Sequence, residues 1–160
     1  MKSFLELVGV LLLSGGIALA AITEQVPPSS SDLQVIRADF GLFNPPGSGK
    51  PPFVPSRTVP LAEGQAYGWI IHLKATKTKI KWREEFTLPS PPTTWGDAQL
   101  QGPQSISEDG RVSITETQVE LDAGVILNIW AVAPGDPAGR YVIRVIIENA
   151  VERVFEFDVQ

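Results

Sequence analysis

Apolar side chains recur at every second position through most of the chain after Leu33. In the segment 66–74 the residues on one face are Tyr67, Trp69, Ile71 and Leu73. Neighbouring side chains of a β-strand point to opposite faces of the sheet, so this period of two predicts strands with one buried face. No later segment shows a convincing helical period. The sequence therefore predicts an all-β fold.

The alternating segments are separated by turns rich in Gly, Pro and Asp. The predicted strands are 34–40, 66–74, 76–88, a short strand ending at Ile106, 111–121, 124–133, 141–147 and 151–159. Residues 44–60 hold six prolines and two glycines, which favour a long extended loop. Many short strands of this kind predict an antiparallel β-sandwich of about seven to eight strands.

The alternation also predicts which side chains are buried. In 34–40 it puts Ile36, Ala38 and Phe40 on one face. In 76–88 it puts an apolar row inside, formed by Ile80, Trp82, Phe86 and Leu88. The strand 124–133 is apolar on both faces, so we expect it to be central and covered on both sides.

The last two strands predict a hairpin whose register is decided by burial. Ile143 and Phe157 share an apolar face only if the loop near Asn149 has an odd number of residues. We expect Ile143 opposite Phe157, with Arg144 opposite Glu156 on the outer face as a cross-strand charge pair.

The start of this hairpin resembles a known kind of domain. Residues 137–145 read Pro-Ala-Gly-Arg-Tyr-Val-Ile-Arg-Val and are similar to the closing G-x-Y hairpin of immunoglobulin-like domains in exported bacterial proteins. Residues 80–89 are similar to uncharacterised exported bacterial families, from which no activity is carried over. The resemblance implies an immunoglobulin-like sandwich in which Tyr141 forms a tyrosine corner. The chain has no cysteine, so the disulfide of antibody domains is absent.

The first residues of the chain predict export. Met1-Lys2-Ser3 is a short cationic start, residues 7–22 carry no charge, and Ala18-Leu19-Ala20 has the small-x-small pattern of a cleavage site. We therefore expect a signal peptide at 1–20, a mobile Pro/Ser-rich linker at 21–32 and one domain at 33–160. An uncleaved signal would anchor the chain in the membrane instead. Both readings place the domain in the periplasm or another extracytoplasmic space.

Charge narrows the range of partners. The net charge of −5 argues against a general affinity for nucleic acid or for anionic membranes. Alternation nevertheless puts four cations in one row, which we call the basic row: Lys77, Lys79, Lys81 and Arg83. The row predicts a contact surface for an unidentified protein or acidic polymer of the cell envelope. The competing interpretation is that it protects an exposed edge strand or solubilises an outer sheet face.

Tryptophan supplies a second candidate contact. Trp69, Trp82 and Trp130 lie in apolar strand patterns and are expected in the core, whereas Trp95 lies in the Pro-rich segment 91–97. A loop indole can stack on a sugar or a partner protein, or it can cap the end of the sandwich. The main alternative function is therefore a carbohydrate-binding module that uses Trp95 and neighbouring loop residues. That function predicts a platform of at least two exposed rings.

Reactive side chains are few. His72 is the only histidine, so a catalytic triad or a zinc site would depend on a single imidazole. Loop acids of sandwich domains can gather a calcium ion, but the acids of the predicted loops match no calcium-loop spacing: Asp97, Glu108, Asp109, Asp122 and Asp136. We predict neither a cofactor nor a bound metal.

These features predict an exported, monomeric, non-catalytic interaction or accessory module. An enzyme with an unrecognised pair of carboxylates is the third hypothesis. It predicts two acidic side chains in one cleft, one of them with a raised pKa.

Overall fold

The computed structural model describes residues 32–95 and 103–160, and all regular structure in this part of the chain is β-strand. The strands are β1 (Leu33–Phe43), β2 (Phe53–Pro55), β3 (Thr58–Val59), β4 (Ala66–Ala75), β5 (Lys79–Thr87), β6 (Gln104–Ile106), β7 (Val112–Glu120), β8 (Val125–Ala131), β9 (Gly139–Ile147) and β10 (Val151–Val159). The predicted all-β class is confirmed. The segment 44–60, expected to be a loop, contributes the two additional short strands β2 and β3.

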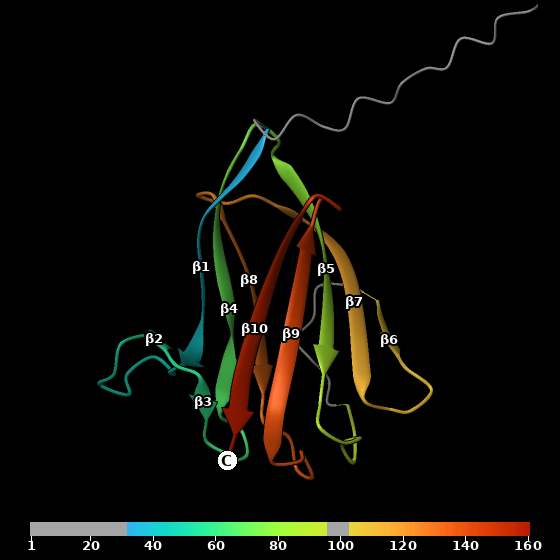
Figure 1. Ribbon diagram of the computed structural model, residues 1–160. Coiled ribbons are helices and arrows are strands. Elements are labelled where there is room, and N and C mark those ends of the chain that lie inside the picture. Colours follow the sequence, from blue (N-terminus) through green and yellow to red (C-terminus); the bar gives the residue numbers. More distant parts are fainter. Residues whose placement is uncertain (1–31, 96–102) are drawn as a thin grey trace, which may run out of the picture.

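The strands form two sheets that face each other (Figure 1). One sheet has the order β2-β1-β4-β8, and the other has the order β3-β10-β9-β5-β7-β6. The segment 53–59 crosses between them, because β2 pairs with β1 and β3 pairs with β10. This arrangement confirms the predicted β-sandwich.

Aromatic rings fill the space between the sheets. The ring centroid of Phe86 on β5 lies 4.8 to 6.5 Å from those of five other aromatic residues: Tyr67, Trp95, Trp130, Tyr141 and Phe157. Trp69 and Trp82 pack edge to face beside this cluster, with centroids 5.3 Å apart. The predicted core positions of Trp69, Trp82 and Trp130 are confirmed, since each side chain is buried.

One acidic side chain lies inside this core. Glu84 occupies the inner row of β5 and is only 1% exposed. Its carboxylate accepts hydrogen bonds from Trp69 Nε1, from Trp130 Nε1 at 2.9 Å and from Asn128 Nδ2 at 3.1 Å. Burial raises the pKa of Glu84 and outweighs the three donors, which favour the ionised form. The bonds join β5 of one sheet to β4 and β8 of the other.

Strand β1 departs from the predicted face pattern because it contains a β-bulge at Ile36. Its pairing with β4 shifts between Val35 and Arg37, so the alternation changes face there. The predicted inward position of Ile36 is therefore wrong: the side chain is 60% exposed, and Val35 packs against the core instead.

Two strands occupy other places in the sheets than their side chains suggest. β8, which is apolar on both faces and predicted to be central, is an edge strand, and Leu127 on its outer face is exposed. β5, which carries most of the basic row, lies in the interior of its sheet between β9 and β7. Protection of an edge strand therefore does not account for the basic row, whereas solubilisation of an outer face is compatible with it.

The hairpin of β9 and β10 has the predicted odd-length loop, in a register shifted by two residues. The loop comprises residues 148–150, two of which have left-handed backbone angles. Ile143 lies opposite Phe155 instead of Phe157, although these side chains share the inner face. The predicted charge pair also changes, because Arg144 lies opposite Val154. Its guanidinium binds the carboxylates of Glu152 at 2.6 Å and Glu85 at 3.1 Å.

Tyr141 forms the tyrosine corner that the resemblance implies. Its hydroxyl donates a hydrogen bond to the main-chain oxygen of Pro137 at 2.7 Å. The side chain itself is buried at the start of β9. The bond therefore ties the loop before β9 to the core.

The predicted signal peptide and all of the predicted linker except Asp32 lie outside the described residues. Within the described ranges, no helix has the length and apolar character needed to cross a membrane.

Candidate functional site

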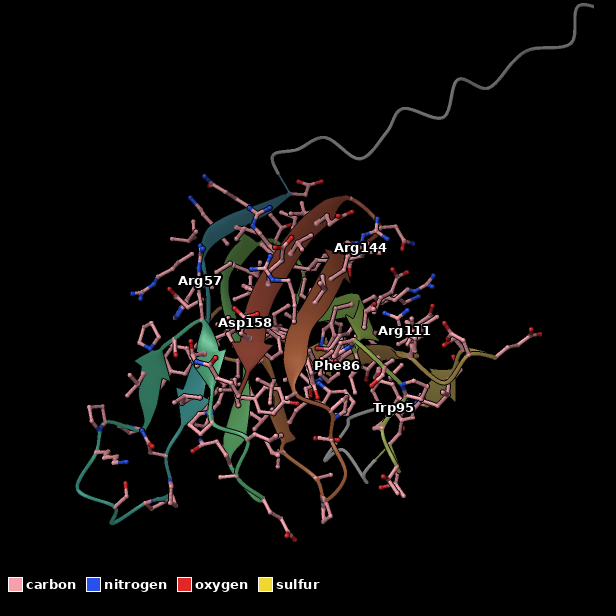
Figure 2. The ribbon with its side chains drawn as sticks, turned by 60° about the horizontal axis from the view of Figure 1, so that its bottom comes forward. Arg57, Phe86, Trp95, Arg111, Arg144 and Asp158 are labelled. Atoms are coloured by element: carbon pink, nitrogen blue, oxygen red, sulfur yellow. The ribbon has the colours of Figure 1, made fainter. Side chains whose placement is uncertain are left out.

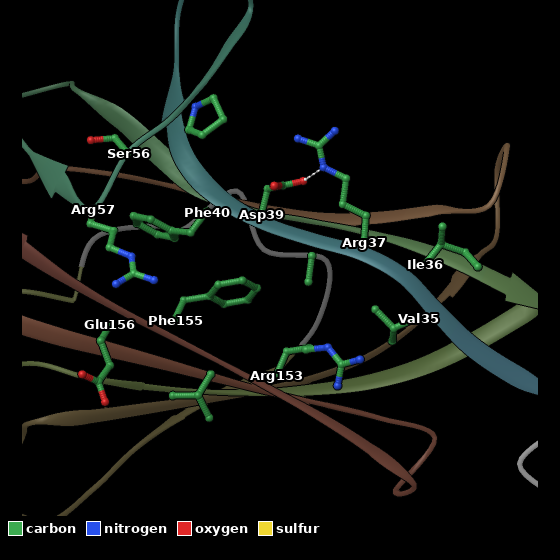
Figure 3. A pocket seen from close by; sticks show the side chains of 13 residues that line it. Val35, Ile36, Arg37, Asp39, Phe40, Ser56, Arg57, Arg153, Phe155 and Glu156 are labelled. Carbon is green, nitrogen blue, oxygen red and sulfur yellow. Dashed lines mark ion pairs between the residues drawn. The ribbon is translucent and has the colours of Figure 1, made fainter.

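An open groove of about 960 Å³ lies where the edge of β1 faces the edge of β10 (Figure 3). We call it the β1–β10 groove. Its walls are residues 35–40 of β1, residues 55–57 of the crossing segment and residues 153–156 of β10. The two strands belong to different sheets. They are therefore separated by the groove and are not joined by a hydrogen-bonded ladder.

Both strands present an open edge to this groove. β1 pairs with β4 on one side, and β2 covers only residues 41–43 on the other. β10 pairs with β9 on one side, and β3 covers only residues 158 and 159 on the other. Within the described chain, residues 33–40 and 151–157 therefore have no strand partner on the groove side.

The crossing segment closes one end of the groove. The main-chain N–H of Ser56 donates to the oxygen of Phe40 at 3.1 Å, and the N–H of Asp158 donates to the oxygen of Arg57 at 2.9 Å. These bonds attach the segment to both sheets. They hold Arg57 at the closed end.

The floor of the groove is aromatic and its rim is aliphatic. The rings of Phe40 and Phe155 lie 6.2 Å apart, and Phe40 also stacks on Phe157 at 4.1 Å. Phe155 is half-buried, so part of its surface faces the groove. Ile36 and Val154 are exposed on the two rims. An occupant can therefore bury apolar surface here.

Three arginines surround this floor. Arg37 forms an ion pair with Asp39 at 2.5 Å, and Figure 3 shows both side chains turned away from the two phenylalanines. The same view shows Arg57 on one side of the Phe155 ring and Arg153 on the other, with the guanidinium of Arg153 turned away from the ring. In residues 32–95 and 103–160, no carboxylate oxygen lies within 4.0 Å of the guanidinium nitrogens of Arg57 or Arg153.

The only acidic residue of β10 that lines the groove has another partner. Glu156 pairs with Arg140 at 3.4 Å on the outer face of the sheet. Arg153 donates from Nη1 to the main-chain oxygen of Glu152 at 2.6 Å, which leaves its charge without a carboxylate. The groove therefore carries a local excess of positive charge in a chain whose net charge is −5.

Sequence reasoning did not identify these groove residues, although a signal for Arg153 is present. It is the one charged side chain in the inner row of the last strand, whose other members are Val151, Phe155, Phe157 and Val159. Glu84 stands out in the same way in the inner row of β5. Arg57 has no comparable signal, because its place beside Arg153 depends on the pairing of its segment with β10, which is distant in sequence.

The basic row lies on the outer face of the six-stranded sheet and at the start of β5. Lys77 binds Glu148 at 2.6 Å, and Lys79 binds Glu120 at 3.2 Å. Arg83 binds two carboxylates, those of Glu85 at 3.0 Å and Glu116 at 3.6 Å. The ammonium group of Lys81 has no such ion pair among the described residues. The chain itself thus neutralises three of the four cations, and the partner-binding role of the row stays a prediction.

Trp95 is half-buried against the end of the sandwich, where Figure 2 shows it near Phe86 and Arg111. Its Nε1 donates to the main-chain oxygen of Gly110 at 2.8 Å, and its ring packs edge to face on Phe86 and Trp130. These contacts match a capping role. All phenylalanines, tyrosines and tryptophans of the described ranges are buried or half-buried, so these ranges hold no platform of two exposed rings.

Trp95 also lines a second cavity, of about 390 Å³, together with Tyr67, Trp130 and Asp136. The rings of Tyr67 and Trp130 are almost completely covered by protein atoms. Little aromatic surface is therefore available there to a ligand.

The remaining candidates are dispersed. His72 is half-buried on β4, where it pairs with Arg37 on one side and Val125 on the other. Asp97 lies outside the described residues. Within those residues, no three of the His, Asp and Glu side chains are grouped so as to hold a metal ion.

Among the described residues, two carboxyl groups have raised pKa values. Burial raises the pKa of both Glu84 and Asp136. Glu84 is enclosed in the core with its oxygens bonded to three donors, and Asp136 accepts a hydrogen bond from the main-chain N–H of Ala133 at 2.8 Å. Glu84 is therefore held by structural contacts and is not open to a substrate.

Comparison with known proteins adds the family. None of the curated proteins matches the chain. The crystal structure of an immunoglobulin-like protein from Pseudomonas aeruginosa superposes with a TM-score of 0.54 and 14% identity, over 82% of this chain and 99% of that chain. At this identity the likeness establishes the fold alone, and it confirms the predicted immunoglobulin-like sandwich. The profile of the PM0630 beta sandwich domain family matches residues 38–160. The chain therefore belongs to the PM0630 beta sandwich domain family.

Proposed function

We propose that this domain is a non-catalytic interaction module that binds an acidic segment of a partner protein in the β1–β10 groove. The observation that carries the proposal is the pair Arg57 and Arg153, which flank an apolar floor without a carboxylate of their own. Arginine forms charge-assisted, often bidentate hydrogen bonds with carboxylates. An aromatic floor between such groups provides the apolar contact that interface centres usually contain.

The groove is a better candidate surface than the basic row because of how the charges are paired. At three cations of the basic row, a partner would have to displace Glu148, Glu120 or Glu116, and among the described residues only Lys81 is without an ion pair. At Arg57 and Arg153 no ion pair of the described chain has to be broken. Binding there also buries part of Phe155. The hollow of about 480 Å³ beside Lys81 and Arg83 on the outer face is lined by Glu116 and Glu148, which would repel an acidic segment.

Selection of random linear peptides on the purified protein tests this proposal. We expect the selected peptides to be rich in Asp and Glu. Their affinity should fall about tenfold for each arginine reversed in Arg57→Glu and Arg153→Glu, since a hydrogen bond to a charged group contributes about 1.5–3 kcal/mol. The matched control is Lys79→Glu with Lys81→Glu, which changes the net charge of the chain equally and should leave the affinity within about twofold of the wild type.

Two results would contradict the groove as the binding surface. One is a set of selected peptides without acidic residues, or no selected peptide at all. The other is binding that survives reversal of both arginines and is lost when Lys79 and Lys81 are reversed, which would assign the partner to the basic row. Unfolding curves of both double variants are measured alongside, because Arg57, Lys79 and Lys81 are exposed whereas Arg153 is half-buried, and binding is compared only between variants that are folded.

We also propose that the module acts outside the cytosol, because residues 1–20 have the three parts of a signal peptide. The intact mass of the protein recovered from an exporting host should correspond to a chain that begins near Ala21. A mass that includes Met1 and Lys2 in the cell-envelope fraction would show an uncleaved anchor instead.

A further inference from the structure

We infer, building on the proposed function, that the acidic segment binds as an additional β-strand along the open edge of β10. Between Val151 and Phe157 this strand pairs with β9 only, and its other edge faces the β1–β10 groove. The edge is roughly 20 Å long at about 3.4 Å per residue. Main-chain groups on such an edge are a template for an incoming strand. The oxygen of Glu152 accepts from Arg153 Nη1, and it becomes available when that guanidinium binds a carboxylate of the segment instead.

The edge of β10 is preferred over that of β1 because β10 is regular. β1 carries the β-bulge at Ile36 in the middle of its open part, where the ladder is disrupted and the strand bends. β10 keeps one continuous register with β9 from Val151 to Val159. A bulge interrupts the ladder that an added strand would have to form, whereas an uninterrupted edge can accept it.

The same edge of β10 already pairs with a short strand at its far end. β3 lies parallel to β10 there, and the N–H of Asp158 and of Gln160 donate to the main-chain oxygens of Arg57 and Val59 at 2.9 and 3.1 Å. An added strand would occupy the same sheet position, next to residues 151–157. The groove is the space that such a strand would fill.

The side chains of the groove define the kind of segment that fits. On β10, Arg153 and Phe155 both point inward and are two residues apart, so they face alternate side chains of a neighbouring strand on the same side. The incoming segment should therefore carry an acidic and an apolar side chain separated by one residue. A further acidic side chain at the closed end would meet Arg57.

The test uses the tightest acidic peptide selected on the wild-type protein, together with two copies of it. One copy is N-methylated at its odd-numbered residues and the other at its even-numbered residues, so that each copy has one of its two strand edges blocked. N-methylation keeps every side chain and every charge but removes main-chain donors. We expect the copy whose methyl groups lie on the edge that pairs with β10 to bind at least tenfold more weakly than the parent peptide. Amide hydrogen exchange of the complex should slow in residues 151–157 of β10 and stay unchanged in residues 33–40 of β1.

The outcomes separate this inference from the proposed function. If the N-methylated copies all bind as well as the parent peptide, or exchange slows in β1 instead of β10, strand addition to β10 is wrong, while binding in the groove stands. If no acidic peptide depends on Arg57 or Arg153, both proposals fail. If Arg153 only guards the edge against pairing, Arg153→Ala should bind the peptide like the wild type and self-associate in size-exclusion chromatography, which would also overturn the inference.

Discussion

Replacement of Glu84 by alanine is expected to lower the free energy of unfolding by about 3–5 kcal/mol, because each buried donor left without its acceptor costs about 1–3 kcal/mol. The carboxylate is 1% exposed and accepts from two indole N–H groups and the Asn128 amide. All three donors would lose their acceptor away from water, and a cavity would form between the sheets. Urea unfolding followed by circular dichroism measures the loss.

The control for Glu84 is its neighbour on the same strand. Glu85 points to the outer face, where it forms ion pairs with Arg83 at 3.0 Å and Arg144 at 3.1 Å. Partly exposed pairs of this kind contribute about 1 kcal/mol or less, so Glu85→Ala should cost far less than Glu84→Ala. Equal losses of unfolding free energy for the two variants would show that the buried hydrogen bonds of Glu84 contribute no more to stability than the surface ion pairs of Glu85.

Glu84 also gives stability a pH dependence of known sign. Its pKa in the folded protein is raised above the ordinary value of 4.5, chiefly by burial, so the folded state holds this proton more tightly than the unfolded state does. The contribution of Glu84 is therefore complete below pH 4.5 and is lost as the pH rises toward the folded-state pKa. Relative to Glu84→Gln, the wild type should lose stability over this interval. If the wild type instead gained stability relative to Glu84→Gln as the pH rises, the predicted sign would be wrong.

Replacement of Phe86 by alanine is expected to cost a further large amount, about 3–5 kcal/mol, as is typical when a buried aromatic ring is deleted. The ring is 2% exposed and contacts rings from both sheets, including Tyr67 on β4 and Phe157 on β10. Its removal would leave a cavity that the rigid β-sandwich cannot close completely. Thermal and urea unfolding should both report the loss.

Phe43→Ala is the matched control for Phe86. Phe43 is half-buried at the end of β1, and its ring packs on that of Phe53 at a centroid distance of 5.1 Å. Its truncation should cost clearly less, because less apolar area returns to water. If Phe43→Ala were the more destabilising change, the centre of the core would lie near the β1–β2 turn instead of around Phe86.

The local pattern predicted the faces of most strands but not their neighbours. The inner row of β4 is buried as expected, from Tyr67 to Leu73. The apolar β8 nevertheless lies at an edge, and the basic β5 lies in the interior of its sheet. Alternation depends on a strand's own residues, whereas sheet position depends on which distant segments pair with it. Ile36 shows the limit within a strand, because one extra residue in a bulge changes the face of everything before it.

The groove could not be predicted from local patterns, because its formation depends on contacts between segments far apart in the sequence. Arg57 precedes β3 and Arg153 lies on β10, and they flank one space because the segment 53–59 crosses from one sheet to the other. No local pattern relates these two residues. Conversely, Arg153 and Glu84 are each a charge in an otherwise apolar row, a signal that the sequence does contain.

The amino-acid sequence by itself determined that this chain forms a cysteine-free β-sandwich with aromatic inner rows, because a strand's two faces are set by residues two apart. The resemblance of residues 137–145 to immunoglobulin-like domains implied the tyrosine corner, which joins residues only four apart. Only the tertiary structure decided which strands end the sheets, which donors surround Glu84 and which arginines face a groove. Those features arise from hydrogen bonds and packing between segments far apart in the chain. The free energies of these long-range contacts cannot be inferred from the pattern of residues within one segment.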